Sequence, residues 1–297
     1  MSGVPIEPLL REARARLVAA GIDAGSAAHD ARTLLAHVLG VEPSALLLRS
    51  AVAPADAAAF DVLLARRAAR EPLQHLTGRA WFRHVELAVG PGVFVPRPET
   101  ELLAGWAIAA CAGRQRPVVV DLCTGSGAVA AALADEVPGA RVHAVELSEE
   151  AAAYAARNLA GRAVDLRIGD LADAFPELDG TVDVVTANPP YIPLEAWESV
   201  AVEARDHDPA LALFSGPDGL DAIRVVARVA ARLLRPGGVV GCEHADVQGR
   251  SAPAVFARTG DFTDVRDHRD LNDRPRWTTA RRVQEGGVSR WQDGPGE

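Results

Sequence analysis

Apolar residues recur at helical spacing through the first 70 residues of the chain. Leu10, Ala13 and Leu17 fall on one face of a helix. A second stripe stops at Gly40, a usual helix end, and a third has Asp56 in its first turn, where the helix dipole favours an acid. The spacing therefore predicts a small helical bundle with helices over residues 4–20, 26–39 and 54–70.

Arginine is frequent on these predicted helices. Arg66, Arg67 and Arg70 lie close together near the end of the third helix. Charges at such positions most often form a solvated helix face, and contact with a partner is the alternative. We therefore expect these arginine side chains to lie in solvent.

A shorter period follows the helical part. The run from Val85 to Val89 alternates apolar and polar residues, as a strand with one buried face does, and an apolar pair at 81–82 precedes it. These two pieces predict a β-hairpin. Pro96 and Pro98 then flank Arg97 and indicate a rigid connector, because each proline fixes its own φ angle.

Strands and helices alternate after residue 99. Helical segments are predicted at 100–111, 128–134, 149–159 and 223–234. Apolar runs predict strands at 118–122, 142–146, 164–168, 182–185 and 239–242, with a closing antiparallel pair at 262–266 and 277–283. Pro236-Gly237-Gly238 predicts a turn before the fifth strand. This order predicts a Rossmann-like, seven-stranded α/β sheet and a division into a helical domain at 1–76, a hairpin connector at 77–98 and an α/β domain at 99–297.

The most distinctive stretch is Asn188-Pro189-Pro190-Tyr191, which comes directly after the fourth predicted strand. In open α/β sheets, ligands bind beyond the carboxyl ends of the strands. The two prolines fix φ and lack N–H groups, so the loop is stiff and presents carbonyl oxygens, one amide and one aromatic ring. Such a loop suits hydrogen bonds from a planar –NH2 group. The alternative is a plain turn, since Asn and Pro both favour turns.

A second loop of interest follows the first α/β strand, in which Asp121 is the acid near the end. The segment Cys123-Thr124-Gly125-Ser126-Gly127 lies between this strand and a helix of small residues. Glycines let a ligand approach the backbone, and the helix N-terminus offers free N–H groups. The order of strand, turn and helix indicates a nucleotide-like site. The turn lacks the third glycine of the full dinucleotide motif, so by itself it is not specific.

Acidic residues also follow the next two strands. Glu146 ends the second strand, 19 residues beyond Gly127, where an acid bonds ribose hydroxyls in doubly wound folds. The alternative is an ordinary surface carboxylate. Asp170 and Leu171 follow the third strand. Asp170 either accepts a hydrogen bond from an adenine amino group, with Leu171 against the ring, or caps the following turn.

Composition limits the function classes. All 31 Lys and Arg positions are arginine, and residues 1–96 carry a net charge of about +1 against about −10 for the rest. Nucleic-acid-binding domains usually show a basic footprint, so the acidic part argues against DNA as substrate. Three scattered cysteines favour neither a disulfide framework nor a zinc site and fit a reducing cytoplasm. No stretch has the length and apolarity of a membrane span, and the start lacks a signal-peptide pattern.

Together these motifs resemble the class I S-adenosylmethionine-dependent methyltransferases and, more narrowly, the family that methylates glutamine in peptide-chain release factors (the PrmC/HemK type). The resemblance covers nearly the whole chain. Asn-Pro-Pro-Tyr is shared with adenine methyltransferases, but Pro-Arg-Pro-Glu-Thr at 96–100 and the N-terminal bundle separate the two. Other matching segments are 72–78, 121–127, 210–211, 218–220 and 270–274. Cys123 stands where the family often has glycine, and a cysteine permits the turn provided that its φ is negative.

The resemblance implies a function and a set of site residues. S-adenosylmethionine is the implied cofactor, and the implied substrate is the glutamine of the GGQ motif in class 1 release factors, recognised by the helical domain. The implied catalytic and substrate-binding residues are Asn188, Pro189, Pro190 and Tyr191. Arg97 is a cofactor or substrate contact, or alternatively forms a structural ion pair with a nearby acid. The implied cofactor contacts are Asp121, Cys123, Thr124, Gly125, Ser126, Gly127, Glu146, Asp170, Leu171 and Asn188.

Other interpretations stay open. A ribosomal-protein glutamine offers the same amide, and adenine in nucleic acid presents a similar –NH2 group. A catalytically inactive binding module with this fold is disfavoured by the intact Asn188 and the intact Gly-rich turn. We further expect a cytoplasmic monomer that binds no DNA, membrane or metal.

Overall fold

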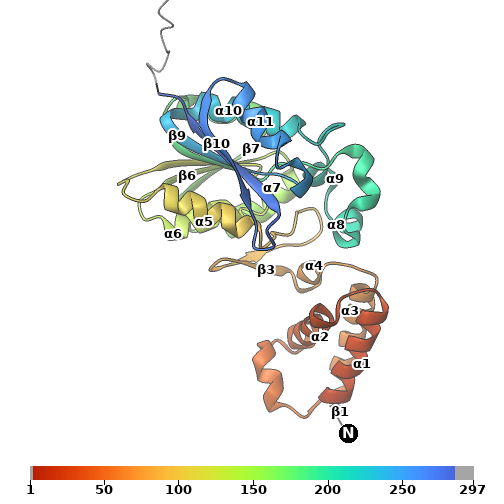
Figure 1. The fold of residues 1–297 in the computed structure, drawn as a ribbon. Helices are drawn as coiled ribbons and strands as arrows, with labels where there is room; N and C mark the ends of the chain where they lie inside the picture. Colours follow the sequence, from red (N-terminus) through yellow and green to blue (C-terminus); the bar gives the residue numbers. More distant parts are fainter. Residues whose placement is uncertain (1–2, 285–297) are drawn as a thin grey trace, which may run out of the picture. The chain divides into compact units, whose positions relative to one another are not determined.

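The computed structural model describes residues 3–284, which divide into two compact units (Figure 1). The first unit contains residues 3–80, 88–95 and 198–209, and the second contains residues 81–87, 96–197 and 210–284. Within the described range, no helix combines the length and apolarity needed to cross a membrane. The three-part division expected at residues 76 and 98 remains a prediction.

The helical unit is a small bundle with an apolar core. Its main helices are α1 (Ile6–Ala19), α2 (Ala24–Leu39), α3 (Pro54–Ala68) and α4 (Leu73–Thr77), with a 3₁₀ helix η1 (Pro43–Leu48). Asp23 caps α2 by accepting from the N–H groups of Gly25 and Ser26, and Gly40 ends this helix in the left-handed region. The first helix begins at Ile6 and not at residue 4, because β1 (Val4–Pro5) pairs with β2 (Ala51–Val52).

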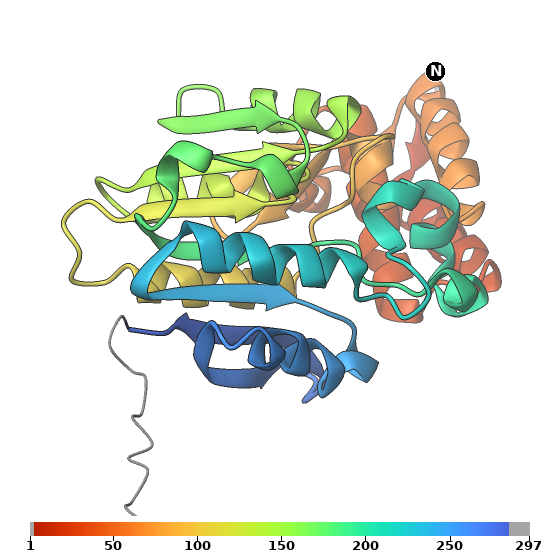
Figure 2. The ribbon, with the colours of Figure 1, turned by 90° about the horizontal axis from the view of Figure 1, so that it is seen from above.

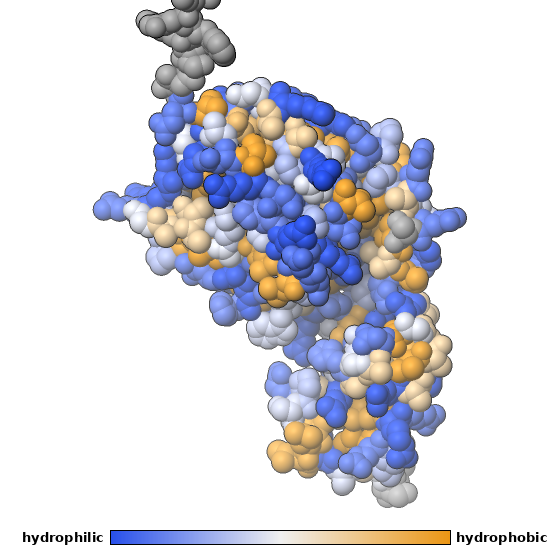
Figure 3. Space-filling model, viewed as in Figure 1, coloured by the Kyte–Doolittle hydropathy of each residue, from blue (hydrophilic) through white to orange (hydrophobic). Residues whose placement is uncertain are grey.

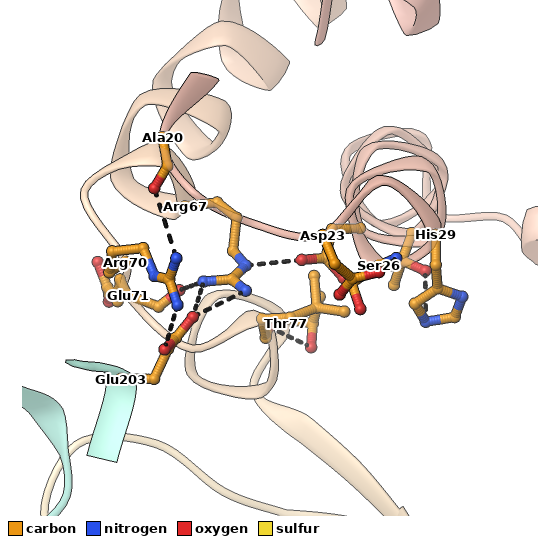
Figure 4. Close-up of polar contacts among 12 residues, drawn as sticks. Ala20, Asp23, Ser26, His29, Arg67, Arg70, Glu71, Thr77 and Glu203 are labelled. Carbon is orange, nitrogen blue, oxygen red and sulfur yellow. Dashed lines mark hydrogen bonds and ion pairs between the residues drawn. The ribbon is translucent and has the colours of Figure 1, made fainter. Parts of the chain in front are cut away.

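A cluster of ion pairs lies inside this unit (Figure 4). The Arg67 side chain is only 8% exposed, and its Nε donates to Asp30 Oδ2 at 2.7 Å. Arg67 also approaches Glu203 at 3.4 Å, and Arg70 donates to Glu203 at 2.7 Å. The expectation of a solvated arginine face is therefore wrong for Arg67. Helical periodicity does not reveal a buried carboxylate 37 residues away in the chain.

The hairpin predicted after the helices is present. Its strands are β3 (Arg79–Phe82) and β4 (Val85–Ala88), which form a two-stranded sheet.

Figure 3 shows a mainly hydrophilic face on which hydrophobic residues form small separate patches. The most exposed large apolar side chains of the described residues are Leu47, Leu48, Val247 and Leu271.

The second unit is built on a seven-stranded sheet, as predicted (Figure 2). Its strands are β5 (Val118–Leu122), β6 (Arg141–Glu146), β7 (Val164–Ile168), β8 (Val182–Ala187), β9 (Leu234–Glu243), β10 (Phe262–Arg269) and β11 (Pro275–Arg282). The spatial order is β10-β11-β9-β8-β5-β6-β7, in which β5 to β9 are parallel and β11 is antiparallel to both neighbours. The sheet is thus doubly wound, with a closing hairpin.

Helices cover both faces of this sheet, as Figure 1 shows. One face packs against α5 (Thr100–Ala110), α6 (Ala128–Glu136) and α7 (Glu149–Asn158), and the other against α10 (Asp221–Leu233) and α11 (Ser251–Arg258). Val120, Val185 and Val240 from adjacent strands share a core with Ile223 and Val226 of α10. Burial on both faces explains why these strands appear in the sequence as continuous apolar runs.

Two parts of this unit differ from the sequence prediction. The fifth strand is longer than predicted and contains the expected Pro236-Gly237-Gly238 turn as an irregularity. Leu234 pairs with Val182 while Val239 pairs with Val184, so the intervening residues bulge out of register. Several short helices were not predicted. Three of them follow β8, namely η4 (Leu194–Ser199), α8 (Val202–His207) and α9 (Ala210–Leu213). The others lie in separate loops, namely η2 (Leu171–Asp173), η3 (Pro176–Leu178) and η5 (Asp246–Gln248).

Candidate functional site

The two loops singled out in the sequence meet at one edge of the sheet. Strand β5 lies between β6 and β8, so the strand order reverses beside it. Leu122 and Ala187, the last residues of β5 and β8, are register partners. The Gly-rich turn and the Asn188 loop therefore begin side by side at the switch point where open α/β sheets bind ligands.

The Asn188 side chain is oriented by a hydroxyl from a helix distant in sequence. Asn188 Nδ2 donates to Thr100 Oγ1 at 3.3 Å, and Thr100 Oγ1 donates to Glu243 Oε2 at 2.7 Å. Because the hydroxyl hydrogen points at the carboxylate, the oxygen is left as an acceptor for an –NH2 group. The amide nitrogen of Asn188 thus faces Thr100, and the amide oxygen faces the other way.

The rest of the loop is fixed through Tyr191. Its N–H donates to the Leu213 carbonyl at 3.2 Å, and its own carbonyl accepts from Gln248 Nε2 at 3.0 Å. A Cβ at Gly219 would lie 2.3 Å from the same carbonyl, so the loop needs glycine there. The phenol hydroxyl donates to Glu243 Oε1 at 3.3 Å, and burial raises the pKa of Tyr191 far above its usual range. Tyr191 is therefore a permanent donor to Glu243.

Glu243 is a buried carboxyl that sequence analysis missed. It is only 2% exposed at the end of β9, and its side-chain oxygens accept from two hydroxyl groups, Thr100 and Tyr191. Burial raises the pKa of Glu243 from its ordinary 4.5 to about 7, although Thr100, the Arg276 charge and Tyr191 oppose the rise. The signal that could have found it is the acid that ends an apolar strand, the pattern already noted for Glu146.

Asp121 holds the Gly-rich turn from beneath. It is 2% exposed, and its oxygens accept from Thr124 Oγ1 at 2.6 Å and from Thr186 Oγ1 at 2.7 Å. Burial raises the pKa of Asp121 to about 6. Asp121 therefore ties the turn to the end of β8, close to the Asn188 loop, a contribution that the sequence did not indicate.

The turn does not meet the condition stated for Cys123, which was a negative φ. Its φ is +58°, in the left-handed region that favours glycine. Gly125 and Gly127 also have positive φ angles, of 57° and 81°. A Cβ at Gly127 would lie 3.2 Å from Leu159, so this glycine allows close helix packing, while nothing lies within 4 Å of a Cβ at Gly125. The open space at Gly125 fits a ligand lying against the backbone.

The predicted ribose and adenine residues lie beside this turn. Glu146 accepts from the N–H groups of Gly125 at 2.8 Å and Ser148 at 2.9 Å, so its carboxylate is held at the turn. Asp170 accepts from the Ala172 N–H at 2.8 Å and thus caps η2, the alternative noted for it. Leu171 packs partly buried against the sheet core. Backbone N–H groups, a carboxylate and an apolar side chain along one edge match the parts of a nucleoside cofactor with hydroxyls and a base.

Arg97 lies near the Asn188 loop. Its charge acts on Tyr191, where it slightly opposes the rise in the pKa of the phenol that burial causes.

Burial also keeps the Cys123 thiol neutral by raising its pKa well above the usual value. Within residues 3–284, no group of three or more His, Cys, Asp or Glu side chains has the arrangement of a metal site.

Comparisons with known proteins agree with this geometry. Residues 8–78 match the model of the PrmC N-terminal domain, and residues 119–207 match a methyltransferase domain. The fold is similar to the hMettl16 catalytic domain, solved in complex with a MAT2A 3′UTR hairpin, with a TM-score of 0.52 and 15% identity over 67% of this chain and 77% of that one.

Two relatives cover most of the chain. A release factor glutamine methyltransferase of Streptomyces coelicolor is 58% identical over 92% of this chain and 96% of its own length. A 4-amino-L-phenylalanine/4-methylamino-L-phenylalanine methyltransferase of Streptomyces pristinaespiralis is 45% identical over 89% of this chain and 91% of its own. The chain therefore belongs to the release factor glutamine methyltransferase family of S-adenosylmethionine-dependent enzymes.

Proposed function

We propose that this enzyme methylates the side-chain amide nitrogen of the GGQ-motif glutamine in class 1 peptide-chain release factors. S-adenosylmethionine supplies the methyl group, and S-adenosylhomocysteine is released. The observation that carries the proposal is the orientation of Asn188, whose amide nitrogen is held by Thr100. The family relatives named as release factor glutamine methyltransferases, which match over almost their whole length, support the same substrate.

The methyl transfer requires hydrogen-bond acceptors that hold the substrate amide in a fixed position. A carboxamide nitrogen is a poor nucleophile, so the enzyme must hold it in line with the methyl group at about 3–3.5 Å. Asn188 Oδ1 and the Pro189 carbonyl accept the two N–H bonds of the substrate amide in this proposal. They orient the nitrogen and stabilise the positive charge that develops on it during transfer. Pro190 stiffens the loop, and Tyr191 limits access of water.

The residues that we propose to bind the cofactor lie at the same edge of the sheet. The segment from Cys123 to Gly127 would lie along the amino-acid part of S-adenosylmethionine, with Asp121 holding the turn. Glu146 would accept from the ribose hydroxyls, because its oxygens retain lone pairs beyond those used by Gly125 and Ser148. Asp170 and Leu171 would flank the adenine. Arg97 would contact the substrate beside Tyr191.

The biological setting is part of the proposal. The helical domain at 1–76 would recognise the release factor, since the PrmC N-terminal domain model matches this region. We further propose a cytoplasmic monomer that does not bind DNA.

A second candidate substrate for methylation has a specific observation in its favour. The Streptomyces pristinaespiralis relative is named for methylation of 4-amino-L-phenylalanine, which is a free amino acid with a planar aromatic amine. The Asn188 loop would accept hydrogen bonds from that amine as well. A glutamine in a ribosomal protein and adenine in nucleic acid are further alternatives with the same –NH2 chemistry.

One assay separates these substrates. The enzyme is incubated with methyl-labelled S-adenosylmethionine and, in parallel, a release factor, ribosomal proteins, DNA and 4-amino-L-phenylalanine. We expect label on the release factor, and its loss when the GGQ glutamine is changed to alanine. Preferential labelling of the free amino acid, or label on a release factor without that glutamine, would overturn the proposal.

A further inference from the structure

A short hydrogen-bonded chain runs from a buried carboxyl to the Asn188 loop. Glu243 at the end of β9 accepts from Thr100 at the start of α5, and Thr100 accepts from Asn188. Both Glu243 and Thr100 are buried. The three residues lie 88 and 55 positions apart in the sequence, so only the sheet brings them together.

The chain has a direction that depends on the charge of Glu243. An ionised carboxylate can only accept, so the Thr100 hydroxyl must donate to it and must accept from the –NH2 of Asn188. A protonated Glu243 can instead donate to Thr100. The hydroxyl hydrogen is then free to point at Asn188, which favours the flipped amide with its oxygen toward Thr100. The flipped amide would present –NH2 to the –NH2 of the substrate.

We propose that Glu243 is a positioning residue that acts through Thr100 to keep the Asn188 amide oxygen directed at the substrate nitrogen. The inference rests on the proposed function, because it assigns an –NH2 group as the acceptor of the methyl. Glu243 itself touches neither substrate nor cofactor in this scheme. Its ionised form supports transfer, and its protonated form suppresses it.

The surroundings of Glu243 place this change near neutral pH. Burial raises the pKa of Glu243 to about 7. Arg276 on β11 opposes the rise, but its guanidinium donates to Asp270 Oδ2 at 3.1 and 3.2 Å. His244, the next residue, has its Nε2 3.2 Å from Asp267. The other titratable groups acting on Glu243 or on its partner Tyr191 are Tyr191 itself, Glu99, Arg97 and Cys242.

The first test removes the link. Thr100→Val lacks the hydroxyl, and Thr100→Ser keeps it as the matched control. At a pH above the pKa of Glu243, where the unmodified enzyme is fully active, we expect kcat of Thr100→Val to fall on the order of 10-fold to 100-fold. The Kd for S-adenosylmethionine, measured by calorimetry, should stay unchanged, and Thr100→Ser should restore most of the turnover. A folded Thr100→Val enzyme with the kcat of the unmodified enzyme would overturn the inference.

The second test replaces the titratable carboxyl of Glu243 by an amide. The unmodified enzyme should lose turnover by about tenfold for each pH unit below the pKa of Glu243. Glu243→Gln can accept from Thr100 through its amide oxygen at every pH, so its kcat should lose this dependence. The same pH limb in both enzymes would overturn the inference. Absence of transfer to a release factor by the unmodified enzyme would instead contradict the proposed function.

A direct readout avoids turnover altogether. The side-chain –NH2 signals of Asn188 in ¹⁵N-labelled protein can be assigned by their loss in Asn188→Asp. These signals should shift with the same midpoint as the pH limb in the unmodified protein and should not shift in Glu243→Gln. If the Asn188 –NH2 signals do not shift with pH in the unmodified protein, the proposed switch in hydrogen-bond direction is contradicted.

Discussion

The helical unit and the sheet edge at the Asn188 loop hold carboxylates in opposite ways. In the helical unit, Asp30 and Glu203 are paired with guanidinium groups of Arg67 and Arg70. Burial alone would raise the pKa of Glu203, but the Arg70 hydrogen bond and the nearby positive charges bring it below its usual value. At the sheet edge that carries the Asn188 loop, Glu243 is bonded to hydroxyls, and burial raises its pKa to about 7.

This difference separates structural from chemical use of a buried acid. A bidentate or clustered guanidinium keeps a carboxylate charged and holds packed elements together. A carboxylate held only by hydroxyls stays sensitive to its proton and passes that sensitivity along its hydrogen bonds. We therefore expect variants of the first cluster to change stability and variants of the second to change turnover.

The largest effect should come from Arg67→Ala. This change leaves Asp30 buried without its cation, and loss of one partner of a buried pair typically costs about 3–5 kcal/mol. The measurement is the free energy of unfolding from denaturant titration. Arg66→Ala is the control, because Arg66 pairs with Glu71 on the surface and should cost at most about 1 kcal/mol. Equal losses in both variants would show that the buried Arg67–Asp30 pair stabilises the fold no more than the surface pair of Arg66 does.

The pH dependence of stability should have opposite signs in the two clusters. Glu243 holds its proton more tightly in the folded state, so its contribution to stability falls as pH rises from about 4.5 to about 7. The stability difference between the unmodified protein and Glu243→Gln should change by about 3 kcal/mol over this window. Glu203 binds its proton less tightly when folded, so its contribution is lost as pH falls through its lowered pKa. Unfolding of Glu243→Gln and Glu203→Gln at a series of pH values checks both signs.

A third variant isolates turnover at the catalytic edge. Asn188→Ala removes one of the two hydrogen-bond acceptors that we propose for the substrate amide, which should lower kcat by about 10²-fold or more. The melting temperature should change little, because the hydrogen bond from this side chain to Thr100 is long, at 3.3 Å. A methyl-transfer assay with a release factor and a thermal melt provide the two values. Unchanged kcat would exclude Asn188 from catalysis.

The sequence predicted the strands and loops that form this site but not the hydrogen bonds that link Glu243, Thr100 and Asn188. Apolar runs located the strands, and Asn188-Pro189-Pro190-Tyr191 could be placed after β8 because strand period and proline stiffness are local properties. Thr100 and Glu243 meet Asn188 only through the strand order of the sheet, which no local pattern encodes. Arg67 was misplaced in solvent for a similar reason, since its partner Asp30 belongs to another helix.

The left-handed φ angle of Cys123 leads to the smallest expected effect. Cys123 and Arg70 are both non-glycine residues with left-handed φ angles, of 58° and 69°. Such a conformation costs roughly 1–2 kcal/mol. Arg70 uses it to donate to the Gly21 carbonyl at 2.8 Å and to Glu203. Cys123 has a neutral thiol that contributes no comparable ion pair.

Replacement by glycine should therefore act in opposite directions at these two positions. Cys123→Gly relieves the strain, and after the greater entropy loss of glycine it should stabilise the protein by roughly 0.5–1 kcal/mol. Arg70→Gly relieves the same strain but deletes the guanidinium, so it should destabilise the helical unit. Denaturant titration of both variants gives the two signs. If Cys123→Gly is destabilising, its side chain has a packing role at the turn that outweighs the strain.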